Sequence, residues 1–153
     1  MTVVDQRRVL VVDDDPGIRD LLVKILTMQD LTVDVAEDGV RAVALLTENP
    51  YAVVLLDLMM PGVDGFSILD RIGRGEILSA PVVLVVTAAD RATIDRLDAQ
   101  RIHGVIRKPF DPDEIARLVV ACAEIKSRSS FGPMAIATML AGGPFFALLH
   151  RLP

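Results

Sequence analysis

The sequence predicts a doubly wound α/β domain, in which helices cover both faces of a five-stranded parallel sheet. Short apolar runs alternate with stretches of helical periodicity five times along the chain, a pattern typical of parallel strands joined by helices. The 153 residues match the length of one domain rather than several. We therefore expect one α/β domain followed by a short C-terminal addition.

The first two strand–helix units occupy the N-terminal third of the chain. Residues 8–12 (RVLVV) are apolar and β-branched, as in a strand buried on both faces. Asp15 is a predicted N-cap for a helix that begins at Pro16. Residues 31–36 alternate in polarity, which indicates a half-exposed strand near a sheet edge, and residues 40–47 form a weaker helical face.

The third and fourth strands end at polar residues. Residues 51–56 (YAVVLL) predict a buried strand that ends at Asp57. The Pro-Gly and Asp-Gly pairs within residues 58–65 indicate a loop, and a short helix begins at Phe66. Residues 81–86 (PVVLVV) predict the fourth strand, which leads to Thr87.

The last two units are shorter or weaker. Ile94 and Leu97 indicate only a faint fourth helix, and residues 104–106 predict a short fifth strand that is followed by Lys108. Pro112 at a first helical position predicts the start of the fifth helix. Five apolar residues continue that helix at helical spacing: Ile115, Leu118, Val119, Cys122 and Ile125.

Composition and charge exclude several classes of protein. Residues 1–126 contain all 21 acidic and 14 of the 16 basic residues, a net charge of −7, so no surplus of Lys and Arg favours nucleic-acid binding. The single cysteine, Cys122, excludes a disulfide framework and a cysteine-based metal cluster. The N-terminus carries no signal-peptide pattern, so we expect a cytoplasmic protein.

The polar residues that follow the strands predict the site. In a flavodoxin-like sheet with the common strand order 2-1-3-4-5, ligands bind at the carboxyl ends of the strands. Asp13, Asp14, Asp57, Thr87 and Lys108 all follow or end a predicted strand and therefore fall at that edge. Converging carboxylates favour Mg²⁺, and a lysine with a threonine hydroxyl suits phosphoryl oxygens. A carboxylate in such a setting can act as a nucleophile towards phosphorus.

Four segments carry a resemblance to a known family. VLVVDDDP, VVLLDLMMPGVDGF, VVTA and KPF resemble the response-regulator receiver domain of two-component signalling. The resemblance covers roughly residues 7–126, and we assign residues 1–126 to this domain. It implies that Asp57 accepts a phosphoryl group from a sensor histidine kinase or a phosphotransfer protein. The output would be an interaction with a downstream protein, and the domain would catalyse only its own phosphotransfer and dephosphorylation.

The resemblance also implies individual roles within the site. Thr87 and Lys108 would hold the phosphoryl group, and residues 61–62 (Pro-Gly) match the loop that positions the acceptor. The Lys108–Pro109 peptide bond would be cis. Four residues would hold Mg²⁺: Asp14 and Asp57 directly, Asp13 mainly through metal-bound water, and Met59 through its backbone carbonyl.

Two positions depart from the family pattern. Val105 stands where the family commonly has a tyrosine or phenylalanine that changes rotamer on phosphorylation, so a rotating ring cannot be the output signal here. Residues 98–104 (DAQRIHG) also depart from the usual small, acidic pattern. Within them, we expect the lone His103 to be a surface or half-buried strand residue rather than a ligand.

Two other functions on the same architecture remain as alternatives. A flavin-binding electron carrier would need a phosphate cradle after the first strand and aromatic rings around the flavin. Here that loop is anionic, and the chain has one Tyr and no Trp. A Mg²⁺-dependent phosphohydrolase of the haloacid-dehalogenase type would carry a second Asp two residues after Asp57, where this chain has Met59.

The C-terminal segment is unlike the receiver pattern. Residues 127–130 (SRSS) read as a linker, and residues 131–149 carry no charge. That length approaches a membrane span, but Gly142-Gly143-Pro144 would break a continuous helix. We expect a helix near residues 134–141 that packs on the receiver body, on its face of helix 4, strand 5 and helix 5, or in a homodimer. Membrane contact through residues 131–149 is the less favoured alternative, and disorder of the segment is the least favoured.

Overall fold

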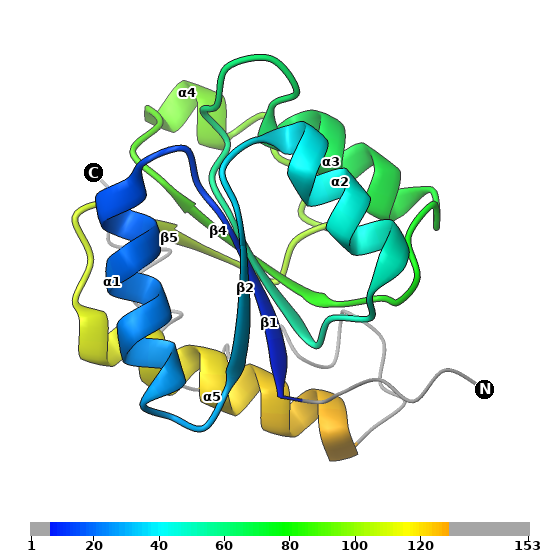
Figure 1. Cartoon of the computed structure of the whole chain (residues 1–153). Coiled ribbons are helices and arrows are strands. Elements are labelled where there is room, and N and C mark those ends of the chain that lie inside the picture. Colours follow the sequence, from blue (N-terminus) through cyan, green and yellow to red (C-terminus); the bar gives the residue numbers. More distant parts are fainter. Residues whose placement is uncertain (1–6, 129–153) are drawn as a thin grey trace.

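The computed structural model describes residues 7–128 and arranges its five strands as one parallel sheet (Figure 1). The strand order is β2-β1-β3-β4-β5, which confirms the predicted doubly wound topology. The chain passes back across the sheet after β2, so the switch in winding lies between β1 and β3. The strands are β1 (Arg8–Val12), β2 (Thr32–Ala36), β3 (Val53–Leu56), β4 (Val82–Thr87) and β5 (Gly104–Arg107).

The helices form two layers around this sheet, with α1 and α5 on one face and α2 and α3 on the other (Figure 1). Each layer packs on its own set of strand side chains because successive residues of a strand point to opposite faces. Val9 and Val11 join the core under α1 and α5, whereas Leu10 and Val12 join the other core. The helices are α1 (Pro16–Thr27), α2 (Gly39–Glu48), α3 (Gly65–Gly73), α4 (Arg91–Ile94) and α5 (Pro112–Arg128).

The burial of each strand follows its place in the sheet. Every residue of the central strands β3 and β4 is buried, whereas β2, whose only sheet neighbour among residues 7–128 is β1, keeps exposed positions at Thr32 and Val35. This confirms the prediction of a half-exposed strand near the sheet edge. The continuous apolar runs fill the centre because parallel sheets are covered on both faces.

Aspartate side chains cap the N-termini of all five helices that the structure describes. The Asp15 carboxylate accepts hydrogen bonds from the backbone N–H groups of Gly17 and Ile18, as predicted. Asp38, Asp64, Asp90 and Asp111 cap α2, α3, α4 and α5 in the same way. Each such cap contributes about 1 kcal/mol to helix stability.

Several predicted boundaries are wrong by a few residues. The third strand begins at Val53, although Tyr51 before it is fully buried. The fourth helix is a single turn that ends before Leu97, because the aspartates around it favour turns: the Asp98 carboxylate accepts from the Gln100 N–H. At the other end, α5 continues through Arg128, two residues into the predicted linker, since serine and arginine do not break a helix.

The predictions for the apolar C-terminal segment lie outside the described residues. This applies to the helix near residues 134–141 and to membrane contact through residues 131–149. Within residues 7–128, none of the helices combines the length and the apolar character that crossing a bilayer requires.

Candidate functional site

Three carboxylates meet at the carboxyl ends of β1 and β3. The register pairs Val12 with Leu56, so Asp13 and Asp57 follow on neighbouring strands at the same level. Oxygen atoms of Asp13, Asp14 and Asp57 all lie within 4.8 Å of one another. Asp13 and Asp57 are only 2% and 4% exposed, whereas Asp14 is exposed. The structure thus brings together the carboxylates that the sequence places at this edge.

Lys108 joins two of these carboxylates. Its ammonium group lies 2.6 Å from Asp13 Oδ2 and 3.2 Å from Asp57 Oδ2. Lys108 directly follows β5, and its backbone N–H donates to the Thr87 carbonyl. The peptide bond to Pro109 is cis, as the family resemblance implies. A single cation therefore bridges the two buried acidic groups.

The electrostatics of the pair follow from burial and charge. Burial raises the pKa of the Asp13 carboxyl, and hydrogen bonds from Lys108 and from the Asp15 N–H offset only part of this effect. Burial also opposes the charge on Lys108, but Asp13 and Asp57 outweigh it, so the pKa of the ammonium group rises above its usual value. Lys108 therefore stays protonated at neutral pH.

The donor set fits a divalent cation with oxygen ligands. When ionised, the three carboxylates and the Lys108 ammonium together carry a charge of −2, which a divalent ion would neutralise. Asp14 has no hydrogen bond or ion pair with another of residues 7–128, and it lies at the exposed side of the cluster. Mg²⁺ prefers one or two carboxylates together with waters and phosphate oxygens, which matches an open, acidic site of this kind.

Thr87 ends the strand beside β3 and makes no hydrogen bond to these carboxylates within the described part of the chain. It is the last residue of β4 and is fully buried. The β3–β4 register pairs Leu56 with Val85, so Thr87 sits one residue beyond the level of Asp57. Its Oγ1 accepts a hydrogen bond of 3.1 Å from the Ala89 N–H, which leaves the hydroxyl proton available to donate.

The loop after β3 positions Asp57 from its other side. The Met59 backbone N–H donates to Asp57 Oδ1 at 3.2 Å, and Met59 itself is exposed. Gly62 has a φ of 78°, a conformation that favours glycine. At Gly65, a Cβ atom would lie 2.5 Å from the Asp57 carbonyl oxygen. The first residue of α3 therefore packs directly against the backbone of Asp57.

Gly65→Ala should lower the free energy of unfolding by about 1–3 kcal/mol, the usual range for overpacking. The added Cβ would meet backbone atoms of Asp57 and Leu58, and these cannot turn away as a side chain can. This cost exceeds the gain of up to about 1 kcal/mol that alanine brings to a helix. Urea denaturation would measure the change.

Gly17→Ala is the matched control for this substitution. Gly17 also lies in the first turn of its helix, but there a Cβ would approach only the Asp15 carboxylate, at 3.2 Å. A Gly65→Ala protein as stable as the Gly17→Ala protein would contradict the proposed backbone contact.

Two arginines that support the site were not identified from the sequence. The Arg19 guanidinium donates to the Asp13 carbonyl oxygen at 2.7 Å, and Arg107 donates to the Ala89 carbonyl oxygen at 3.3 Å. Arg19 thus holds the backbone after β1, and Arg107 holds the loop after β4. No local sequence pattern identifies either arginine, because each guanidinium group donates to a backbone carbonyl oxygen that lies outside its own helix or strand.

The residues that depart from the family pattern have structural partners. Val105 is half-buried and, like Ile94 and Leu97, packs against the core beneath α2 and α3. His103 is half-buried directly before β5, and its Nδ1 accepts a hydrogen bond of 2.9 Å from the Val83 N–H. Of the two expected settings, surface or half-buried, the second is confirmed, but His103 lies just before the strand and not within it. Because its Nδ1 serves as an acceptor, the ring is neutral.

Stability should fall as the pH drops below about 6.5, the ordinary pKa of histidine, partly through His103. Burial first, and then the nearby Lys126 ammonium, lower the pKa of His103 in the folded state. Between this lowered pKa and about 6.5, the unfolded chain binds more protons than the folded one, so acid favours unfolding. Below the lowered pKa both states are protonated and this contribution becomes constant. Urea denaturation across this pH range would measure it.

His103→Asn provides the comparison, because an amide oxygen can accept from the Val83 N–H without titrating. The wild type should lose more stability than this variant as the pH falls through the window. Parallel stability curves for the two proteins would contradict the assignment to His103.

Sequence comparisons identify relatives of the chain. The family model described as the response regulator receiver domain matches residues 9–120. The transcriptional regulatory protein TcrA of Mycobacterium tuberculosis is 35% identical over 127 residues, which cover 83% of this chain and 47% of that protein. ResD of Bacillus subtilis, also a transcriptional regulatory protein, is 33% identical over 131 residues, 86% of this chain and 54% of its own length.

The chain therefore spans about half the length of these relatives. Because their names mark them as transcriptional regulators, the expectation that this protein has no nucleic-acid partner stays a prediction.

Solved structures share the same fold. A CheY-like response regulator receiver domain protein from Methanospirillum hungatei has a TM-score of 0.71 and 27% identity, covering 81% of this chain and 99% of that one. The response regulator TrrA of Thermotoga maritima, crystallised in complex with Mg²⁺-BeF, has a TM-score of 0.67 and 29% identity. The matched region covers 76% of this chain and 98% of the TrrA chain.

Proposed function

Because the chain belongs to the response regulator receiver domain family of two-component signalling, we propose that its Asp57 accepts a phosphoryl group from a histidine kinase or a phosphotransfer protein. The observation that carries this assignment is the Lys108 ammonium held between Asp13 and Asp57, beside the exposed Asp14. An ammonium group in this position can bind an oxygen atom of an incoming phosphoryl group. The two hydrogen bonds to Asp57, from Met59 and Lys108, orient its carboxylate.

The proposed transfer forms an acyl phosphate on Asp57. A carboxylate oxygen of Asp57 attacks the phosphorus atom of a phosphohistidine, and the phosphorus–nitrogen bond breaks. The electron pair stays on the departing imidazole nitrogen, and a proton on the other ring nitrogen keeps the imidazole neutral. Water later hydrolyses the acyl phosphate, which releases inorganic phosphate and restores the carboxylate.

Lys108 and Thr87 are the proposed phosphoryl-binding residues. The Lys108 ammonium would turn from the Asp57 carboxylate to a phosphoryl oxygen while keeping its shorter bond to Asp13. The Thr87 hydroxyl can donate its proton to a second phosphoryl oxygen while still accepting from the Ala89 N–H. Both groups stand at the ends of neighbouring strands, so a phosphoryl group at Asp57 would lie within their reach.

Receiver domains bind Mg²⁺ at this acidic pocket, and we assign the ligands in this chain as follows. Asp14 and Asp57 would bind the ion directly, Asp13 mainly through a water ligand, and Met59 through its backbone carbonyl. When bound, Mg²⁺ neutralises charge that would otherwise repel the phosphodonor.

Receiver domains generally act as signalling modules rather than enzymes, and we propose that this chain catalyses only its own phosphotransfer and dephosphorylation. The phosphohydrolase alternative is not favoured, because the Met59 side chain cannot transfer a proton. The flavin-binding alternative is not favoured either, because a negatively charged cluster of Asp13, Asp14 and Asp57 would repel a flavin phosphate.

We infer that the output is a protein–protein interaction controlled by the loop after β4. That loop is held at Ala89 by two hydrogen bonds, one to Thr87 Oγ1 and one from Arg107. A Thr87 hydroxyl drawn towards a phosphoryl group would shift Ala89, and no aromatic ring at position 105 is needed for this signal. Because histidine kinases draw their phosphate from ATP, we place the protein in the cytoplasm.

The test of the proposed function is direct phosphorylation of the full chain. Incubation with Mg²⁺ and acetyl phosphate should add the mass of one phosphoryl group, and the modified peptide should contain Asp57. Chelation of Mg²⁺ with EDTA should prevent the modification. Modification that maps to another residue, or none in the presence of Mg²⁺, would contradict the proposal.

A further inference from the structure

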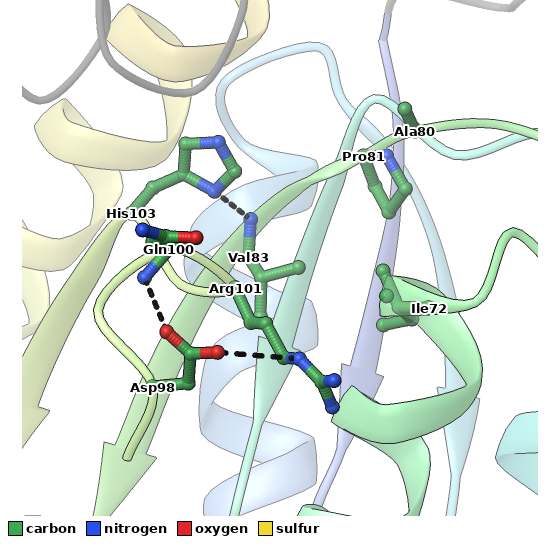
Figure 2. A pocket seen from close by; sticks show the side chains of 9 residues that line it. Ile72, Ala80, Pro81, Val83, Asp98, Gln100, Arg101 and His103 are labelled. Carbon is green, nitrogen blue, oxygen red and sulfur yellow. Dashed lines mark hydrogen bonds and ion pairs between the residues drawn. The ribbon is translucent and has the colours of Figure 1, made fainter.

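A cavity of about 400 Å³ lies at the end of the sheet opposite to the acidic site (Figure 2). The end of α3, the segment that leads into β4 and residues 98–103 before β5 line it. Its volume falls in the range of pockets that bind ligands. No role in phosphotransfer follows from its position, since the carboxylates lie at the other ends of the strands.

The charged groups around this cavity already have partners. Arg101 lies 2.8 Å from Asp70 and 3.5 Å from Asp98, and His103 accepts from the Val83 N–H. Figure 2 shows the Arg101–Asp98 and His103–Val83 contacts. An ionic ligand would have to displace these bonds, whereas an apolar group would gain by burial alone. Apolar surface is supplied by Ile72, Ala80, Pro81 and Val83.

The described part of the chain ends close to this cavity. The Lys126 ammonium on α5 donates to the carbonyl oxygen of Ala80, which lines the cavity. Arg128, the last residue of α5, follows two positions later. Residues 131–149 come next and carry no charge. At about 3.5 Å per extended residue, the first apolar residues beyond Arg128 can reach the cavity.

We propose that an aromatic side chain from residues 131–149 of the same chain occupies this cavity. The segment contains Phe131, Phe145 and Phe146, which offer large apolar side chains. A tethered segment has an effective concentration of about millimolar order, so this occupant is favoured over a second copy of the chain. Docking here would also remove from water part of a mostly apolar stretch, and large contiguous apolar patches are rarely left exposed on monomers.

The test uses the full chain and the fact that it contains no tryptophan. Three single variants, Phe131→Trp, Phe145→Trp and Phe146→Trp, each provide one fluorescent reporter. At least one should emit at the short wavelengths of a buried indole, independently of protein concentration. Adding Ala80→Phe should fill the cavity from an exposed position and shift that emission to longer wavelength. Ala92→Phe, at an exposed alanine on α4, should not shift it.

Hydrogen exchange gives an independent measurement without a tryptophan. Ala80→Phe should leave the described part of the chain folded but reduce protection across residues 131–149. The proposal is overturned if no reporter responds to Ala80→Phe. It is also overturned if the short-wavelength emission develops only with rising protein concentration, which indicates a second copy. Emission that shifts only on adding phosphatidylglycerol vesicles would assign the segment to a membrane instead.

Discussion

Asp57→Asn should abolish phosphorylation of the full chain by acetyl phosphate and Mg²⁺ while the protein remains folded. The amide lacks the anionic oxygen that attacks phosphorus, so the acyl phosphate cannot form. It keeps nearly the same shape and can still accept the hydrogen bond from the Met59 N–H. Intact-mass spectrometry would measure phosphorylation, and urea denaturation would verify the fold.

Asp20→Asn is the matched control for this experiment. Asp20 is an exposed aspartate on α1, so the substitution makes the same chemical change away from the site, and labelling should match the wild type. Labelling of Asp57→Asn to the wild-type extent would show that another residue accepts the phosphoryl group.

Asp14→Ala should weaken Mg²⁺ binding by at least about tenfold. Changing a residue that merely supports a metal ligand already costs about 10- to 100-fold in affinity, and Asp14 is proposed as a direct ligand. Without metal, stability should stay level or rise, because removing one carboxylate relieves repulsion with Asp13 and Asp57. Isothermal titration calorimetry would measure the affinity, and urea denaturation with EDTA would measure the stability of the metal-free protein.

Asp20→Ala controls for the loss of a surface charge on this acidic chain, and it should bind Mg²⁺ as the wild type does. Equal Mg²⁺ affinity in Asp14→Ala and Asp20→Ala would remove Asp14 from the site. A large loss of metal-free stability in Asp14→Ala would instead show that this carboxylate has a structural role.

The fold could be predicted because its signals are local. Apolar runs such as residues 8–12 and 51–56 form strands wherever both faces are covered, and the Asp15–Pro16 pair starts a helix through its own side chain and ring. The weakest local signal, around Ile94 and Leu97, produced the least accurate element. There the aspartates at 95 and 98 favour turns over further helix, and tertiary packing rather than periodicity holds both half-buried apolar side chains against the core.

The sequence predicted which residues form the site but not how their side chains contact one another. The carboxyl ends of the strands of a parallel sheet lie along one edge. Two carboxylates that each follow such a strand are therefore expected to lie close together. The sequence does not show that Lys108 binds Asp13 more closely than Asp57, or that Gly65 packs against the Asp57 carbonyl. These contacts depend on how the loop after β3 and the loop after β5 pack against the sheet.

The succession of strands and helices along the chain and the helix caps could therefore be predicted from the sequence, because each depends on neighbours a few positions apart. The acidic edge could be predicted because the carboxyl ends of parallel strands share one edge of the sheet. The bridge between Asp13 and Lys108 joins residues 95 positions apart, and the Arg107–Ala89 bond joins two elements through a backbone oxygen. Such contacts exist only after β1, β3, β4 and β5 have packed side by side. Packing then fixes the distances and directions of side chains, which residue types alone leave open.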